Sequence, residues 1–335
     1  NLEIMSSTTT HKRHTIEDQR EKAGLWFTED QCPGIKTMVK LLAIHSTDSQ
    51  KSKYQKIDVI ETSFGRTLVT DGKTQSSECD EFIYHESLVQ PAFFLRGILS
   101  SSSHASHDSH ENEDHASLPS SSFVPETVFI GGGGELATAR EVLRHSSVKR
   151  CIMVDLDEEV INVAKEHLPT WGNNATEDPR LELIIGDAHE YIQTSNETFD
   201  IIIMDISDPI EAGPGIMLYT QEFYREAQAR LTKNGVFVTQ AGNAEYCETH
   251  QGSFDSSYAS ITNTLGSVFD CAIPYNIFIP SFQSPWGFVI AFNLDEKQTK
   301  LTTKQTIDIV KNVPEDVIDE MIQTRIKGGA DSLKH

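Results

Sequence analysis

The stretch ETVFIGGGGELATAREVLRH, residues 126–145, decides the fold prediction. ETVFI (126–130) is predicted as a buried strand, and ELATAREVLRH (135–145) as the helix that follows it. The glycines between them let a ligand approach the backbone closely, but such a turn also closes strand–helix corners structurally. A pyrophosphate site disfavours an acid at the helix N-terminus, so Glu135 leaves two interpretations open: a ligand of another kind, or a simple helix cap.

Strands and helices alternate along the chain after this turn. Further strands are predicted at 148–157, 181–187, 199–207 and 235–242. Helices are predicted at 158–168, at 220–231 and near 254–266, and β-like runs at 268–280 and 287–293. Continuous apolar strands separated by helices predict an α/β fold with a Rossmann-like, doubly wound parallel sheet. Ligands of such sheets bind beyond the carboxyl ends of the strands.

Acidic residues follow four consecutive strands of this predicted sheet. They are Glu135, Asp155, Asp187, and the pair Asp205 and Asp208. Each of them alone is better explained as a helix cap or a turn residue. Because the carboxyl ends of parallel strands meet at one edge, all of them together favour a nucleoside pocket beside a carboxylate-rich site that attracts cations.

The rest of the chain has a different character. Residues 1–23 are predicted as a flexible tail and 24–80 as a small antiparallel β-domain. The Rossmann-like domain takes 81–335, begins with a helix over 80–99, and carries a disordered His/Ser-rich insertion at about 100–122. Four histidines of that insertion allow a metal site, but nothing in such a segment fixes coordination geometry, so we expect none.

Composition narrows the class of partner. The 335 residues carry a formal net charge of −22, which repels nucleic acid and anionic membranes and attracts small cations, or simply keeps the protein in solution. No apolar run approaches the length of a membrane-spanning helix. Five scattered cysteines without CxxC spacing favour reduced thiols and a cytoplasmic location.

Several motifs together resemble the polyamine aminopropyltransferases, the spermidine and spermine synthase family. They are SKYQKIDV (52–59), GRTLVTDGKTQSSECDEFIYHE (65–86), GGGGELATARE (131–141), VDLD (154–157), GDAHEY (186–191), DISDP (205–209) and VTQAG (238–242). The resemblance implies a small β-domain before a methyltransferase-type Rossmann-like domain, and a homodimer or homotetramer. It also implies transfer of an aminopropyl group from decarboxylated S-adenosylmethionine, which is a co-substrate; no cofactor or metal is implied.

The resemblance assigns residues to the donor. Glu135 would hold the donor's ammonium group and repel the carboxylate of ordinary S-adenosylmethionine. Asp155 would hold the ribose hydroxyls, and Asp187 with the Ala188 backbone the adenine. The remaining donor-binding residues implied by the family are Gln55, Gln75, Gly132, Gly133 and Gly134.

The resemblance also assigns residues to catalysis and to the acceptor amine. Asp205 and Tyr84 are the implied catalytic residues, because the attacking amine must lose a proton before its nitrogen has a lone pair. The implied polyamine-binding residues are His85, Asp208, Gln240, Phe282 and Trp286. His85 is equally well explained as a buried, hydrogen-bonded core histidine, and Phe282 and Trp286 as core packing.

Two features separate this chain from the usual family pattern. Leu136 stands where the family pattern has glycine, which would narrow the donor pocket. The segments 71–92, 208–220 and 280–288 are most similar to thermospermine synthases, so spermidine is the expected acceptor. Agmatine, putrescine, or spermidine extended to spermine remain open, as do an S-adenosylmethionine methyltransferase and a non-catalytic polyamine-binding protein.

Overall fold

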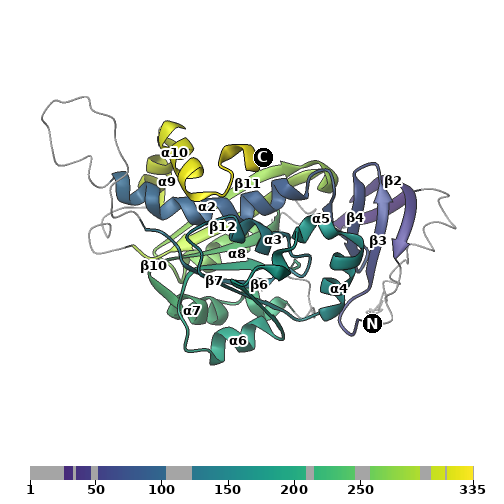
Figure 1. Cartoon of the computed structure of the whole chain (residues 1–335), viewed down its shortest axis with the longest axis horizontal. Coiled ribbons are helices and arrows are strands. Elements are labelled where there is room, and N and C mark those ends of the chain that lie inside the picture. The colour runs from purple at the N-terminus through teal and green to yellow at the C-terminus, as the bar shows by residue number, and fades with distance from the viewer. Residues whose placement is uncertain are drawn as a thin grey trace, which may run out of the picture. The chain divides into compact units, whose positions relative to one another are not determined.

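The computed structural model describes residues 26–32, 35–46, 52–102, 123–208, 215–245, 257–294, 303–313 and 315–334 (Figure 1). The chain divides into two compact units, with the boundary between Glu78 and Cys79. The predicted tail at 1–23 and nearly all of the predicted insertion lie outside the described residues, as does 209–214 of the loop that follows Asp208.

The first unit is an antiparallel sheet of five strands in the order β1-β2-β3-β4-β5. The strands are β1 (Trp26–Cys32), β2 (Ile35–Ser46), β3 (Ile57–Thr62), β4 (Gly65–Thr70) and β5 (Lys73–Ser77). Phe27, Leu41, Ile60 and Val69 form its buried core. The small antiparallel domain is confirmed; its strands β1 and β5 are polar and carry no apolar pattern from which they could be predicted.

The second unit is built on a seven-stranded sheet in the order β11-β12-β10-β9-β6-β7-β8. Its strands are β6 (Thr127–Gly132), β7 (Arg150–Asp155), β8 (Leu181–Ile185), β9 (Phe199–Asp205), β10 (Leu231–Asn243), β11 (Cys271–Ile279) and β12 (Ser284–Phe292). Strands β6 to β10 run parallel, and β12 and β11 add an antiparallel edge. The predicted α/β fold is confirmed, with its switch point between β6 and β9.

Helices cover both faces of this sheet. They are α2 (Glu81–Ser102), α3 (Ala137–Leu143), α4 (Glu158–His167), α5 (Pro169–Gly172), α6 (Ala188–Thr194), α7 (Gln221–Ala229), α8 (Ser257–Gly266), α9 (Thr303–Lys311) and α10 (Glu315–Arg325). In Figure 1, α6 and α7 lie on one side of the sheet and α2, α9 and α10 on the other. Val89 and Val142 pack with Val128 in one core, and Ile192 and Phe223 belong to the other. None of the described helices is long and apolar enough to cross a membrane.

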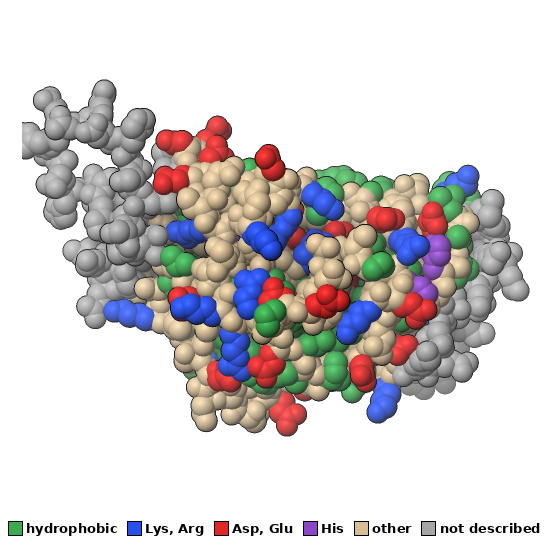
Figure 2. Space-filling view, in the orientation of Figure 1, with side chains coloured by type: hydrophobic (Ala, Val, Ile, Leu, Met, Phe, Trp, Pro, Cys, Tyr) green, Lys and Arg blue, Asp and Glu red, His purple; other side chains and the backbone are tan. Residues whose placement is uncertain are grey.

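Short 3₁₀ turns complete the second unit at η1 (Ala175–Glu177), η2 (Ile216–Tyr219), η3 (Pro280–Phe282) and η4 (Ala330–Ser332). On the face seen in Figure 2, lysine and arginine side chains lie among acidic ones and do not gather into one basic patch. That face therefore has the mixed charge of an ordinary protein surface, although the chain as a whole is strongly acidic.

One predicted boundary was wrong in an informative way. The helix expected from Glu135 starts at Ala137, because Leu136 has φ 72°, in the left-handed region that favours glycine. Its side chain is buried in the core. A Cβ added at Gly172 would come to 2.9 Å from the Leu136 Cβ, so leucine fits at 136 where residue 172 has no side chain.

Candidate active site

The candidate site forms where the glycine turn after β6 meets the end of β9. Gly132 pairs with Asp205 in the sheet, and the Gly133 N–H donates to the Asp205 carbonyl at 2.8 Å. Both glycines have positive φ, +82° and +77°. A Cβ at Gly132 would overlap the Asp205 carbonyl, so this close approach requires glycine.

The Asp205 side chain receives two hydroxyl hydrogen bonds. The Tyr84 Oη donates to Oδ1 at 2.8 Å, and the Thr138 Oγ1 donates to Oδ2. Burial raises the pKa of the Asp205 carboxyl; the positive charge of His85 opposes this shift, and the negative charge of Glu135 adds to it. A half-buried carboxylate with a raised pKa is a stronger base than an ordinary one, which suits it to accept a proton.

The Tyr84 ring packs among three other aromatic side chains. Its ring makes edge contacts with His85, Phe282 and Phe288, at centroid distances of 5.0, 6.2 and 5.4 Å. Burial and the Asp205 charge raise its pKa well above the usual value, so the hydroxyl stays protonated and donates. Phe282 in turn packs on Trp286 at 4.7 Å. The predicted contacts of Phe282 and Trp286 with an amine stay predictions.

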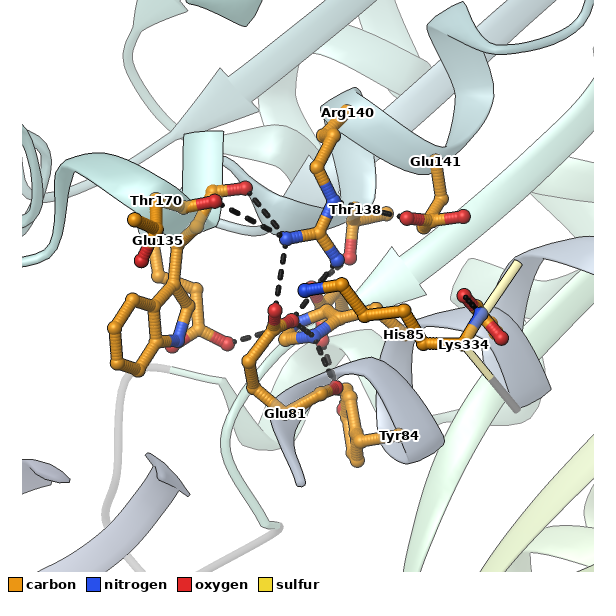
Figure 3. Close-up of polar contacts among 12 residues, drawn as sticks. Glu81, Tyr84, His85, Glu135, Thr138, Arg140, Glu141, Thr170 and Lys334 are labelled. Atoms are coloured by element: carbon orange, nitrogen blue, oxygen red, sulfur yellow. Dashed lines mark hydrogen bonds and ion pairs between the residues drawn. The ribbon is translucent and has the colours of Figure 1, made fainter. Parts of the chain in front are cut away.

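His85 lies at the centre of a buried chain of charges (Figure 3). Its Nδ1 is 2.6 Å from the Glu81 carbonyl and 3.0 Å from the Glu81 carboxylate, and its Nε2 is 2.8 Å from the Glu135 carboxylate. Arg140 binds the Glu81 carboxylate through two nitrogens, both at 2.9 Å. Glu135, predicted as a donor ligand, therefore also contacts a protein cation.

The charges of this chain shift one another's pKa values. Burial by itself lowers the pKa of His85, but the hydrogen bonds and charges of Glu135 and Glu81 outweigh it and raise the pKa to about 10. Burial raises the pKa of Glu81, yet His85 and Arg140 bring it down to about 2. At neutral pH His85 is thus a cation and Glu81 an anion.

The remaining acids of the parallel strands differ in burial. Asp155 ends β7 beside the glycine turn: a Cβ at Gly134 would lie 2.9 Å from its Oδ2. Burial raises the pKa of Asp155 to about 6, although its carboxylate accepts the Asp157 N–H at 2.8 Å. Asp187 is exposed and caps α6, accepting the His189 N–H at 2.8 Å, and Ala188 is the first residue of that helix.

Gln240 anchors the loop that carries Asp208. The side-chain amide of Gln240 is 2.7 Å from the Ile206 carbonyl and 3.2 Å from the Asp208 carboxylate. It also contacts the Tyr219 Oη at 2.8 Å, and its Oε1 accepts the Gly242 N–H at 2.7 Å. Gln240 is 2% exposed, whereas Asp208 is exposed. The predicted amine contacts of both residues stay predictions.

Two predicted donor residues belong to the first unit. The Gln55 N–H donates to the Ser52 Oγ at 3.2 Å, just before β3. The Gln75 side chain in β5 donates to the Lys73 carbonyl at 3.2 Å. Their contacts with a donor stay predictions.

Three residues of this region were missed by sequence reasoning: Glu81, Thr138 and Arg140. Glu81 stands four residues before His85, and this spacing on one helix face was an available signal. Thr138 and Arg140 are three and five residues after Glu135, in the quoted stretch itself. Tyr219, whose hydroxyl donates to the Ser207 carbonyl at 3.1 Å, lies in the segment 208–220 that resembles thermospermine synthases, but the sequence assigned it no role.

Comparison with known proteins gives consistent results. The family model "Spermine/spermidine synthase domain" matches residues 109–305. A polyamine aminopropyltransferase of Aeropyrum pernix is 41% identical, over 82% of this chain and 77% of that protein. The thermospermine synthase ACAULIS5 of Arabidopsis thaliana is 40% identical, over 72% of this chain and 62% of that protein.

Solved structures agree with the sequence relatives. A spermidine synthase crystallised with the transition-state analogue AdoDATO superposes with a TM-score of 0.65 at 27% identity, over 89% of this chain and 94% of that one. The fold, the motifs and the relatives point to the same conclusion. The chain belongs to the spermine/spermidine synthase family of polyamine aminopropyltransferases.

Proposed function

We propose that this protein transfers the aminopropyl group of decarboxylated S-adenosylmethionine to spermidine, giving thermospermine and 5′-methylthioadenosine. The observation that carries the proposal is the Asp205 carboxylate. It is half-buried at the switch point of the sheet, has a raised pKa, and accepts hydrogen bonds from Tyr84 and Thr138. Ligands of such sheets bind beyond the carboxyl ends of the parallel strands, so this carboxylate lies where a bound amine can give up its proton.

The donor differs from ordinary S-adenosylmethionine in having an ammonium but no carboxylate at the end of its chain. Glu135 attracts that ammonium and would repel a carboxylate, so it selects the donor by the sign of its charge. Asp155, beside the glycine turn, holds the ribose hydroxyls. Asp187 and the Ala188 backbone bind the adenine. The turn glycines Gly132, Gly133 and Gly134 complete the donor site within the second unit, and contacts of the donor with Gln55 and Gln75 stay predictions.

The chemical step is a displacement at carbon. The amine nitrogen attacks the methylene beside the sulfonium, a C–N bond forms, the C–S bond breaks, and its electron pair stays on sulfur. Asp205 takes the proton that the attacking ammonium must lose, and the Tyr84 hydroxyl orients Asp205. Asp208 binds a second ammonium of the polyamine. This mechanism uses no covalent enzyme intermediate and no cofactor or metal.

The choice of spermidine as acceptor rests on similarity. The segments 71–92 and 280–288, which carry His85, Phe282 and Trp286, resemble thermospermine synthases, and a protein of that name is 40% identical. Other relatives are named polyamine aminopropyltransferases without a stated acceptor, which is why the assay must include several amines. We also expect a homodimer or homotetramer in the cytoplasm.

The test is a product assay. The protein is incubated with the decarboxylated donor and, in separate reactions, putrescine, agmatine, spermidine or spermine, and 5′-methylthioadenosine is measured. Chromatography must separate thermospermine from spermine, because the two have the same mass. We expect thermospermine from spermidine; spermine as the sole product, or turnover only with putrescine or agmatine, would refute this acceptor. Turnover with ordinary S-adenosylmethionine would indicate a methyltransferase, and no turnover with any amine a binding protein.

A further inference from the structure

We propose that His85, Glu81 and Arg140 are positioning residues for Glu135, and that they set the affinity for the cationic end of the donor. The inference rests on the proposed function. It also changes the role expected of His85, from a contact to the acceptor amine to a support for the donor site.

The surroundings of His85 determine its charge. Its side chain is fully buried, with 0% exposed. The Glu81 carbonyl can only accept a hydrogen bond, so Nδ1, 2.6 Å away, carries a proton. The other nitrogen faces the Glu135 carboxylate at 2.8 Å. A ring with both nitrogens protonated satisfies both sides at once, and places a positive charge directly against Glu135.

Arg140 fixes the opposite end of this chain of charges. It grips the Glu81 carboxylate in the planar, two-bond geometry that only arginine provides. It also donates to the Trp171 carbonyl at 2.8 Å and, through Nε, to the Glu141 carboxylate at 2.9 Å. Glu81 is therefore held on one side by Arg140 and on the other by His85, and neither carboxylate oxygen can move independently.

The four side chains carry charges of alternating sign, in the order Glu135 negative, His85 positive, Glu81 negative and Arg140 positive. Dashed lines in Figure 3 mark the contacts between them. All four side chains are at least largely buried, so each charge is stabilised mainly by its neighbours. Removing a member releases the next one. Glu135 is the end of the chain that belongs to the donor site, so the consequence of any break appears there.

The two ligands for the test share the nucleoside and differ in the aminopropyl group and in the sulfonium charge that this group creates. Decarboxylated S-adenosylmethionine carries the ammonium that Glu135 holds, whereas 5′-methylthioadenosine lacks the whole aminopropyl group. Binding of both to the full-length protein is measured by calorimetry. Steady-state assays give separate KM values for the donor and for spermidine.

The first variants are His85→Gln, which keeps hydrogen-bonding groups but loses the charge, and Arg140→Gln, which breaks the grip on Glu81. We expect donor binding to weaken roughly tenfold to a hundredfold in both, with donor KM rising accordingly. Binding of 5′-methylthioadenosine and the KM for spermidine should change less than about threefold. Arg140→Lys keeps the charge without the paired hydrogen bonds and should fall between wild type and Arg140→Gln.

Matched controls use charge pairs in other places. His45→Gln removes a histidine that contacts the Glu61 carboxylate at 2.8 Å in the first unit. Arg150→Lys changes an arginine paired with Glu182 and Glu197 at the surface. Both controls should leave donor binding unchanged.

A variant could lower activity by unfolding, so thermal unfolding is recorded for each one. The double variant Glu81→Gln/Arg140→Gln removes both partners and leaves no lone buried charge between them, and it should still weaken donor binding selectively. Equal weakening of both nucleoside ligands, or a rise in spermidine KM alone, would overturn the inference. If the wild-type protein itself neither binds nor uses the decarboxylated donor, it is the proposed function that fails.

Discussion

Strand β9 carries an aspartate near each end, and the two have different surroundings. Asp200, near the start, accepts four hydrogen bonds: from the N–H groups of Glu126 and Thr127 at 2.9 and 3.0 Å, and from the hydroxyls of Thr127 and Thr232 at 3.1 and 2.9 Å. Asp205, at the other end, accepts two from the hydroxyls of Tyr84 and Thr138. Both side chains are half-buried.

The difference teaches how one residue type serves two purposes in one strand. Backbone N–H groups cannot be rearranged, so Asp200 is committed to joining β6, β9 and β10. Hydroxyls can rotate, and burial raises the pKa of Asp205, so this carboxyl can accept a proton. Asp205 lies at the switch point, where ligands of such sheets bind, whereas Asp200 lies near the opposite end of β9.

The largest difference between the two aspartates is expected when Asp205→Asn is compared with Asp200→Asn. Loss of the proton acceptor should lower kcat about 10³-fold, while the fold stays intact, since the amide oxygen can still accept one of the two hydroxyl hydrogen bonds. Asp200→Asn should keep kcat within about twofold and lower the free energy of unfolding by about 1–3 kcal/mol. Release of 5′-methylthioadenosine and thermal unfolding measure the two effects. Full activity in Asp205→Asn would remove Asp205 from the mechanism.

The positive charge of His85, which lies beside the Asp205 end of β9, can be tested by its effect on the free energy of unfolding. The pKa of His85 is raised from its ordinary value of about 6.5 to about 10, so its contribution to stability is complete below about pH 6.5 and is lost as pH rises through about 10. His85→Gln has no such dependence. At about pH 6 the variant should be less stable by on the order of 3 kcal/mol, and at about pH 10 the gap should largely close. Thermal unfolding of both proteins is measured at the two pH values. The same stability difference at both would mean that His85 is not charged.

Tyr84→Phe tests the hydroxyl that distinguishes Asp205 from Asp200. Without this donor the ionised form of Asp205 is less stabilised, so its pKa should rise further and the acidic limb of the kcat profile should move to higher pH. We expect a loss of about tenfold in kcat near neutral pH. Tyr275→Phe, which removes a hydroxyl that donates to the Ser87 carbonyl at 2.8 Å, should leave the limb in place. Identical profiles for both variants would assign Tyr84 a packing role.

The smallest effect is expected at Asp187, the exposed acid after β8. Asparagine caps helices as well as aspartate does, so Asp187→Asn should leave the unfolding temperature unchanged. If Asp187 also reads the adenine, donor KM should rise roughly threefold to tenfold. Donor titrations at fixed spermidine measure it, and an unchanged KM would leave Asp187 as a cap alone.

Much of the second unit could be predicted from local pattern. Runs such as 201–204 are apolar and are followed by an acid, so both the strand and the position of Asp205 follow from periodicity and the rule for strand ends. The first unit was harder, because β1 and β5 are polar and are formed by pairing with their neighbours. Helices α9 and α10 were not predicted at all.

The candidate site divides in the same way. Acids at strand ends are visible in the sequence, but the contact between His85 and Glu135 joins residues 50 positions apart, and Tyr84 and Asp205 are 121 apart. Such pairs depend on how α2 packs against the sheet, which no local pattern encodes. The resemblance named Tyr84 and Asp205, whereas Arg140 and Thr138 required the structure.

Leu136 and Gly172 have a consequence for how such a chain can change over time. Leucine holds a left-handed backbone at 136, and the space over it is open only because residue 172 is glycine. With glycine at 136, the three atoms nearest to a Cβ at 172, all of which belong to the Leu136 side chain, would be absent. Once leucine is in place, a side chain at 172 is excluded until 136 reverts. The two positions therefore admit substitutions in one order only, and an engineer restoring glycine at 136 would regain freedom at 172.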